Sequence, residues 1–349
     1  MPFSECPLVS RVREIRMHGL NGGRTHSAAL ARCDKSDLPM RTLLACAAAL
    51  SVVSVAPSGI SALQTVRLNR TVELLAQGRP AFGFLSHDRS PENARALARS
   101  GLDFLIIDME HGPLDIETLR IFLLGMIDKA RIVQKGNLQM DVTPFVRLPS
   151  NGRDQATFLA KQALDAGVMG IMFPYINTAA EAELAVRSMR YPQRRGSADI
   201  NPAGLRGSGP GIPDWYWGVP NYLELADVWP LDPRGELMCI IQIESAEGLK
   251  NVEAIAAIPG VSALFIGPAD LALSLGVDDS NPELEAAIQS ILKVALQKKV
   301  PVGITTSAGT IERRLREGFN IVTVGFGDGG MTPESARTLG IGRKVAGGM

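Results

Sequence analysis

Short apolar runs alternate with amphipathic stretches of helical length along the chain from about residue 68 onward. Eight of the runs have the length of buried strands: 81–85, 104–107, 143–147, 168–173, 237–243, 263–266, 300–304 and 321–324. Eight stretches between and after them repeat apolar residues at helical spacing: 91–99, 114–127, 153–166, 179–189, 246–257, 282–298, 310–317 and 333–345. The pattern predicts a regular alternation of strands and helices.

Four of the helical stretches open with a start signal. A Ser, Thr or Asn at this position can accept a hydrogen bond from a free backbone N–H of the first turn, and a following proline suits that turn. The signals are Ser90-Pro91, Thr178, Asn281-Pro282 and Thr332-Pro333. They support the helical assignment independently of the apolar spacing.

Eight strands that alternate with eight helices over about 280 residues fit an α/β fold, a TIM (β/α)8 barrel. The alternative architecture is a doubly wound parallel sheet, which ordinarily has a glycine-rich phosphate loop after its first strand. The first strand is followed by SHDRSPEN, which is not such a loop. We therefore expect the barrel.

The first 65 residues differ from the remainder. Residues 1–39 have no periodic apolar pattern, whereas 40–62 combine a positive start, an apolar run and small residues. That layout is typical of a secretory signal peptide, and the apolar run is shorter than the ~20 residues that a membrane span needs. Export follows if translation begins at Met40; if it begins at Met1, the run is internal to a leader. We expect a disordered leader at 1–65 and a barrel domain at 66–349.

Composition excludes several classes of partner and site. The formal net charge at pH 7 is +0, and no cluster of Lys and Arg with interleaved aromatic residues suits a nucleic acid. After the leader the chain has one cysteine, Cys239, which lies in an apolar run and cannot form an intrachain disulfide there. Only His87 and His111 remain as histidines, so a metal must rest mainly on carboxylates.

Active sites of this fold collect where the strands end at their carboxyl side. Five of the expected strands end in polar residues: Ser86-His87-Asp88, Asp108 to His111, Arg147, Gln242 with Glu244, and Gly267-Pro268-Ala269-Asp270. Glu244 and Asp270 follow neighbouring strands, so both carboxylates can reach one ion, Mg²⁺ or Mn²⁺ and also Co²⁺. Taken singly, Asp270 would be a helix N-cap and Glu244 a surface ion-pair residue.

The run LIIDMEHGP presents Asp108, Glu110 and His111 directly after an apolar strand. An imidazole at a strand end is a candidate general base. The two acids first suggest metal ligands, but Glu244 and Asp270 form the better pair. Asp108 and Glu110 then become residues that orient water or His111.

Six segments together resemble the HpcH/HpaI aldolase family: IDMEHGP, FVRLP, LDAG, FPYINTAAEAE, QIESAEGLKN and FIGPADLALSLG. The resemblance runs from about Asn69 to Ala346, and QIE followed by GPADL is its most specific part. It implies a metal-dependent TIM barrel of the phosphoenolpyruvate/pyruvate type, cytoplasmic and usually hexameric, with sites near subunit contacts. Such enzymes serve the catabolism of aromatic or sugar acids.

The resemblance also implies the reaction and residue roles. A 4-hydroxy-2-oxo acid is cleaved reversibly to pyruvate and an aldehyde through a metal-stabilised enolate. Glu244 and Asp270 would bind the metal, Arg147 would contact the pyruvyl oxygen, and His111 would be the base. Asp165, in LDAG, matches the acid that pairs with that histidine. The substrate carboxylate would lie against backbone N–H groups where the next helix opens, within a site of Gln242, Gly267, Pro268, Ala269 and Asp270.

Three alternatives stay open. An imine mechanism needs a lysine at a strand end, but the expected strand cores contain none, and Lys298 and Lys299 precede a strand. A lyase for malyl-CoA or citramalyl-CoA would share the barrel and the carboxylates, yet no basic cluster suits its phosphates. A non-catalytic keto-acid-binding protein would not need both His111 and Asp165.

Other features depart from the family pattern. Either Arg195 or Arg206 could match the arginine of its G-x-R-G turn. The segment 197–236 is long, holds every Trp of the chain, and suggests a satellite core or a subunit contact. His87 could reach the distal end of a substrate or serve as a capping or solvated residue.

Overall fold

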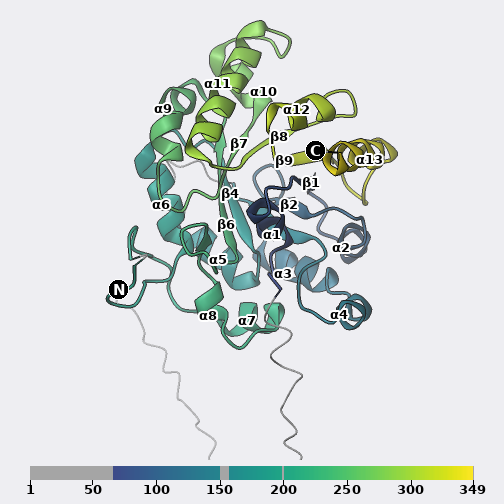
Figure 1. Cartoon of the computed structure of the whole chain (residues 1–349). Coiled ribbons are helices and arrows are strands. Elements are labelled where there is room, and N and C mark those ends of the chain that lie inside the picture. The colour runs from purple at the N-terminus through teal and green to yellow at the C-terminus, as the bar shows by residue number, and fades with distance from the viewer. Residues whose placement is uncertain (1–65, 150–156, 199, 349) are drawn as a thin grey trace, which may run out of the picture. The chain divides into compact units, whose positions relative to one another are not determined.

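The protein is described by a computed structural model that covers residues 66–149, 157–198 and 200–348. Eight parallel strands close into a barrel in the order β4-β3-β2-β1-β9-β8-β7-β6, and β4 pairs with β6 to complete it (Figure 1). They are β1 (Ala81–Ser86), β2 (Phe104–Asp108), β3 (Thr143–Arg147), β4 (Gly170–Phe173), β6 (Leu237–Ile243), β7 (Ala263–Ile266), β8 (Val302–Thr305) and β9 (Ile321–Phe326). The prediction of a TIM barrel is confirmed.

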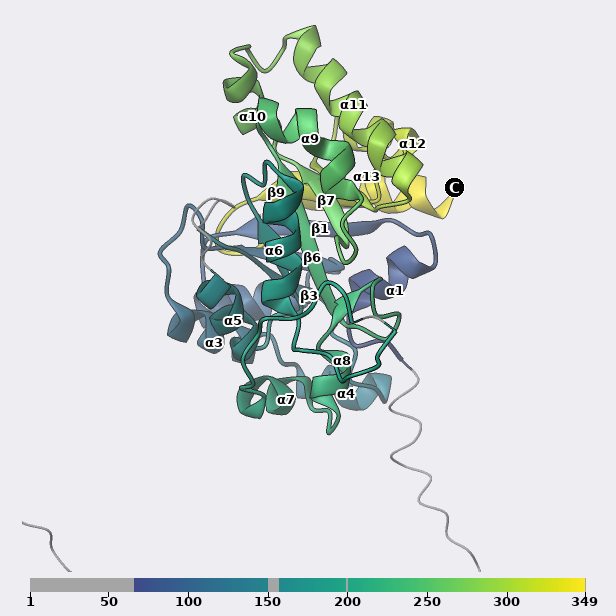
Figure 2. The same ribbon diagram turned by 90° about the vertical axis from the view of Figure 1, so that its left-hand side faces the viewer.

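Helices surround the barrel on its outer side (Figure 2). Those that follow the strands are α2 (Pro91–Ala98), α3 (Ile116–Gly125), α5 (Thr157–Ala166), α6 (Ala179–Met189), α9 (Ala246–Ala256), α10 (Pro268–Leu275), α11 (Pro282–Lys298), α12 (Ile311–Glu317) and α13 (Pro333–Gly347). The four start signals are real caps: the side chains of Ser90, Thr178, Asn281 and Thr332 each accept a backbone N–H of the first turn. Sequence spacing and capping therefore agree with the fold.

Six short elements lie outside the expected strands and helical stretches: α1 (Arg70–Ala76), α4 (Lys129–Lys135), α7 (Gly211–Trp217), α8 (Tyr222–Leu225), β5 (Val228–Trp229) and α10 (Pro268–Leu275). Each has too few turns or residues for its periodicity to stand out. Three of them lie in the segment expected to be a long loop. There Trp217 is buried, and its Nε1 donates a hydrogen bond to the carbonyl of Gly167 at 2.9 Å. This segment thus packs onto the body of the barrel.

Strand residues are buried on both faces because helices cover the outside and side chains fill the inside. Every residue of β6 is buried. Close packing also explains Gly83 in β1, where an added Cβ would lie 2.0 Å from the ring of Phe104. The strands can therefore supply chemistry only at their ends.

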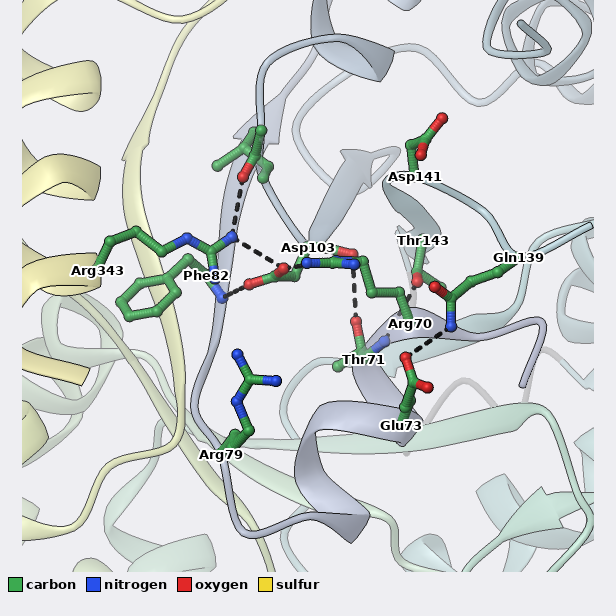
Figure 3. A network of polar contacts seen from close by, with 12 residues as sticks. Arg70, Thr71, Glu73, Arg79, Phe82, Asp103, Gln139, Asp141, Thr143 and Arg343 are labelled. Carbon is green, nitrogen blue, oxygen red and sulfur yellow. Dashed lines mark hydrogen bonds and ion pairs between the residues drawn. The ribbon is translucent and has the colours of Figure 1, made fainter. Parts of the chain in front are cut away.

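The amino-terminal mouth of the barrel is closed by α1 and a polar network around Asp103 (Figure 3). This fully buried carboxylate accepts a hydrogen bond from the backbone N–H of Phe82 at 3.0 Å. Its Oδ1 also lies 2.8 Å from Nε of Arg70 and 2.9 Å from Nη2 of Arg343. One side chain thus joins α1, the first strand and the last helix.

The expected leader at 1–65, its signal-peptide-like segment at 40–62 and the start of the helix expected at 153–166 lie outside the described residues. Within the described ranges, no helix has the combination of length and apolar character needed to cross a bilayer.

We expect Asp103→Asn to lower the free energy of unfolding by about 1–3 kcal/mol, because the two guanidinium groups lose their anionic partner at a buried position. Urea denaturation followed by circular dichroism measures this loss. The matched control is Arg79→Gln, a change near the same network at an exposed residue. Equal stability of the two variants would contradict a structural role for Asp103.

Candidate active site

An ion pair between neighbouring strands organises the carboxyl-terminal mouth of the barrel. Asp108 ends β2 and stands in register with Arg147, which ends β3. The guanidinium donates through Nε to Oδ1 at 2.9 Å and through Nη2 to Oδ2 at 2.7 Å. Burial disfavours the charged carboxylate, but these hydrogen bonds outweigh it and hold the pKa of Asp108 below its ordinary value.

Arg147 also contacts a second acid. Its Nη1 lies 2.9 Å from Oε2 of Glu110. Burial raises the pKa of Glu110, and the positive charge of Arg147 opposes that effect. A guanidinium between two carboxylates has little freedom to rotate, and it stays charged. Asp108 and Glu110 therefore hold the guanidinium of Arg147 in place, and their expected role of orienting water or His111 stays a prediction.

Glu244 lies across the mouth, directly after β6, and is only 1% exposed. Its Oε1 accepts the backbone N–H of Tyr175 at 2.8 Å, and its Oε2 accepts a hydrogen bond from Nε2 of Gln242. A Cβ on Gly267 would lie 2.4 Å from that Oε2. Only glycine leaves room for the carboxylate beside this turn, which explains the residue at the head of α10.

Asp270 is the second carboxylate on this side of the mouth. It occupies the first turn of α10, whose N-cap is Gly267, so Asp270 is not itself the cap. Its Oδ1 accepts a hydrogen bond from the hydroxyl of Tyr175 at 2.8 Å. Tyr175 thus joins Glu244 and Asp270, and it does so from a backbone with φ of 51°, a conformation that a bulky residue rarely adopts.

Mutual repulsion among these acids favours a bound cation. Burial raises the pKa of Glu244 to about 8; the N–H of Tyr175 opposes this, and the nearby Glu110 and Asp270 add to it. A divalent ion held by oxygen ligands would relieve both the burial cost and the repulsion. Within the described ranges no cluster of three or more His, Cys, Asp or Glu side chains is arranged as a metal site. The donors that fit are Glu244 and Asp270, beside the unpaired, buried Oε1 of Gln242.

The expected pair of His111 and Asp165 is not found within one chain. The His111 side chain is 62% exposed at the mouth, with Nε2 3.8 Å from Oε2 of Glu110. Asp165 lies near the end of α5, before β4, and hence at the opposite mouth. There it accepts a hydrogen bond from Nη2 of Arg206 at 2.8 Å. A strand separates the two groups.

The structure also gives the positions of the other histidine, the two candidate arginines and the cysteine. Nε2 of His87 lies 2.9 Å from Oδ2 of Asp108, so this histidine belongs to the mouth. Of the two arginines left open, Arg206 is buried and Arg195 is exposed. Cys239 is buried in β6, and burial raises the pKa of its thiol, which suits a core residue. The described strands contain no lysine that could form an imine.

The segment from Gly267 to Asp270 opens α10 without a side-chain cap. Pro268 has no N–H, and the N–H of Gly267 is directed to the carbonyl of Ile243 at 3.3 Å. The backbone N–H groups of Ala269 and Asp270 therefore remain as donors for an anion at this helix start.

The raised pKa of Glu244 predicts how the metal-free protein responds to pH. A folded-state pKa of about 8, above the ordinary 4.5, gives stability that is complete below the ordinary value and is lost as pH rises toward the folded value. Wild type should therefore lose a few kcal/mol relative to Glu244→Gln between about pH 4.5 and about pH 8. Urea denaturation in EDTA measures both proteins. Parallel pH profiles would show that Glu244 carries no such penalty.

Comparisons with known proteins agree on one group. The family model described as HpcH/HpaI aldolase/citrate lyase matches residues 82–332. A hydroxypyruvate/pyruvate aldolase of Paraburkholderia phytofirmans is 37% identical over 66% of this chain and 80% of that protein. A 5-keto-4-deoxy-D-glucarate aldolase of Escherichia coli is 33% identical over 74% of this chain and 90% of that protein. A solved HpcH/HpaI aldolase/citrate lyase family protein from Burkholderia cenocepacia has a TM-score of 0.63 and 32% identity, covering 80% of this chain and 98% of that one.

Proposed function

The chain belongs to the HpcH/HpaI aldolase/citrate lyase family and is a carbon–carbon lyase of the aldolase type, and from this premise we propose its reaction. It cleaves a 4-hydroxy-2-oxo acid reversibly to pyruvate and an aldehyde. The observation that carries the proposal is the position of Arg147, which is held by Asp108 and Glu110 and lies near enough to Glu244 for the two charges to interact. A fixed guanidinium near a pair of acids that can bind a metal suits a 2-oxo acid, which carries its keto oxygen and its carboxylate at one end.

Glu244 and Asp270 are the proposed ligands of a divalent cation, Mg²⁺ or Mn²⁺, with Co²⁺ also compatible with oxygen donors. Enzymes of this family generally use such an ion. When bound, it supplies positive charge next to the 2-oxo group, where negative charge develops as the carbon–carbon bond breaks. Tyr175 holds both carboxylates in place through its N–H and its hydroxyl.

Arg147 stabilises the same developing charge from the protein side. Three of its N–H contacts go to Asp108 and Glu110, and its remaining N–H groups can donate to the 2-oxo oxygen. Because the guanidinium is already oriented and charged, little reorganisation is needed during the reaction. The carboxylate of the substrate is received by the segment Gly267, Pro268, Ala269 and Asp270, with Gln242 beside it.

His111 is the proposed base. An imidazole nitrogen takes the proton of the C4 hydroxyl as the aldehyde forms, and returns it in the synthetic direction. Nε2 of His111 lies 3.8 Å from Oε2 of Glu110. The pairing of His111 with Asp165 stays a prediction, and because the two lie at opposite mouths of one barrel it needs a second copy of the chain. That fits the expected homo-oligomer, by resemblance a hexamer.

The cellular location also stays a prediction: cytoplasmic by resemblance, or exported if translation begins at Met40.

Pyruvate release from a panel of 4-hydroxy-2-oxo acids, coupled to lactate dehydrogenase, tests the reaction. We expect release that is lost in EDTA and restored by Mg²⁺ or Mn²⁺. Glu244→Gln should lower kcat/KM about a thousandfold, since a metal ligand contributes several kcal/mol. Glu253→Gln, an exposed acid of α9, is the matched control. Metal-loaded protein that releases no pyruvate from any member would contradict the proposal.

His111→Ala should lower kcat by about 10²–10⁴-fold, because proton transfer then falls to water. Mn²⁺ affinity should stay unchanged, since His111 is not among the proposed ligands, and isothermal titration calorimetry measures it. Full turnover in this variant would remove His111 as the base. Loss of both turnover and metal binding would place its role in the metal site instead.

A further inference from the structure

A cavity of about 570 Å³ lies at the amino-terminal mouth of the barrel, on the side opposite the candidate active site. Its lining includes Leu102 and Val142, which precede β2 and β3, and residues of α1, α4 and the end of α2. None of its lining residues takes part in the proposed aldol reaction. Pockets for small organic ligands have volumes of roughly 300–1,000 Å³, so this cavity is large enough for a ligand of its own.

The helix α4, which forms one wall of the cavity, has no core-facing side. None of its residues is buried, and Val133 is 82% exposed. Polar contacts fasten it: Asp128 accepts two backbone N–H groups of its first turn, and Nζ of Lys135 lies 2.9 Å from Oδ1 of Asp141. Its residues that line the cavity are Ala130, Arg131 and Gln134. The helix thus encloses a cavity instead of packing on the barrel core.

Three arginines from three separate segments line the cavity, so the sequence shows no basic cluster there. They are Arg70 of α1, Arg99 at the end of α2 and Arg131 of α4. Their side chains are accessible, with exposed fractions of 35%, 61% and 48%. The acids in the lining are Asp128 and Asp141. Cations therefore outnumber acids around the cavity, although the formal net charge of the whole chain is +0.

Both acids are already paired with neighbouring cations. Oδ2 of Asp128 accepts Nε of Arg99 at 2.8 Å and lies 2.6 Å from its Nη2. Oδ1 of Asp141 lies 2.9 Å from Nζ of Lys135 and 3.6 Å from Nη2 of Arg131. A guanidinium has several N–H donors, and these pairs use only some of them. The others remain for a ligand.

Arg70 links the cavity to the polar network that closes this mouth. Its Nε donates to Oδ1 of Asp103 at 2.8 Å, and Nη2 of Arg343 lies 2.9 Å from the same oxygen (Figure 3). Arg343 also donates to the carbonyl of Gly101, a lining residue of the cavity, at 2.9 Å. One carboxylate is thus shared by two guanidinium groups, which leaves positive charge beside the cavity.

The positive charge continues on the neighbouring surface. A second cavity of about 420 Å³ shares Arg99 and Asp128 with the first and adds Arg95 and Lys129, both exposed. Positive charge of this kind draws anions toward a surface.

We propose that the larger cavity binds a small organic phosphate, with its phosphate group on Arg70, Arg99 and Arg131. Arginine pairs with phosphate through two parallel N–H bonds, and a phosphate has oxygens enough to meet guanidinium groups from several sides. An inorganic ion would leave much of the cavity unfilled. The carbon part of the ligand would lie against the apolar residues of the lining, Ala98, Leu102, Ala130 and Val142.

Isothermal titration calorimetry of the full chain, with Mg²⁺ present and phenyl phosphate as the probe, tests the site. Wild type should bind phenyl phosphate more tightly than inorganic phosphate, which has no carbon part, and more tightly than benzoate, which has no phosphate. Arg99→Gln should weaken the binding of phenyl phosphate about tenfold, the effect of one lost charge-assisted hydrogen bond.

Two further variants locate the ligand. Arg131→Gln removes a guanidinium from another wall and should weaken binding to a similar extent. Arg316→Gln removes an exposed arginine of α12 that also pairs with an acid, 2.8 Å from Glu312, and should leave the affinity at its wild-type value. Exposed ion pairs contribute little to stability, so all three variants should fold.

Four outcomes overturn the site. They are a wild type that does not bind phenyl phosphate at millimolar concentration, and one that binds benzoate or inorganic phosphate equally well. Affinity that stays unchanged in both Arg99→Gln and Arg131→Gln would place the phosphate elsewhere. An equal loss in Arg316→Gln would show a nonspecific effect of net charge. Because none of these measurements involves pyruvate, each leaves the proposed aldol reaction as it stands.

Discussion

The bidentate ion pair of Asp108 and Arg147 is the interaction on which the site depends. It joins the ends of two neighbouring strands in register, and both partners are buried. A charge buried away from water is tolerated only when an opposite charge pairs with it in good geometry. The fold therefore requires this ion pair, and the ion pair in turn fixes the orientation of the guanidinium. Glu110, His87 and the carboxylates across the mouth are arranged around it. Arg147 can therefore meet a keto acid without first being ordered.

Much of this arrangement could be predicted because parallel strands fix where their carboxyl ends meet. The apolar runs mark the strands, and Asp108, Arg147 and Glu244 are each found at the last residue of a run or directly after it. Tyr175 could not be found in that way. Its contribution depends on an unusual φ and on two hydrogen bonds to distant residues, and neither leaves a local pattern in the sequence.

Asp165 and the loop after β1 show two other limits. Asp165 precedes its strand, so barrel topology alone places it away from His111, and only a partner chain could bring them together. The sequence alone does not fix the role of the loop after β1, whereas in the structure Oδ1 of Asp328 accepts the backbone N–H groups of His87 and Asp88, and Nε2 of His87 lies 2.9 Å from Oδ2 of Asp108.

In the proposed complex, pyruvate binds between Arg147 and a cation on Glu244 and Asp270. The most direct measurement is the nuclear magnetic relaxation of the pyruvate methyl protons in the presence of Mn²⁺-loaded protein. Wild type should enhance their relaxation strongly, and Glu244→Gln, at the same total Mn²⁺, should reduce the effect to that of free ion. A wild type with bound Mn²⁺ and no enhancement would contradict the account.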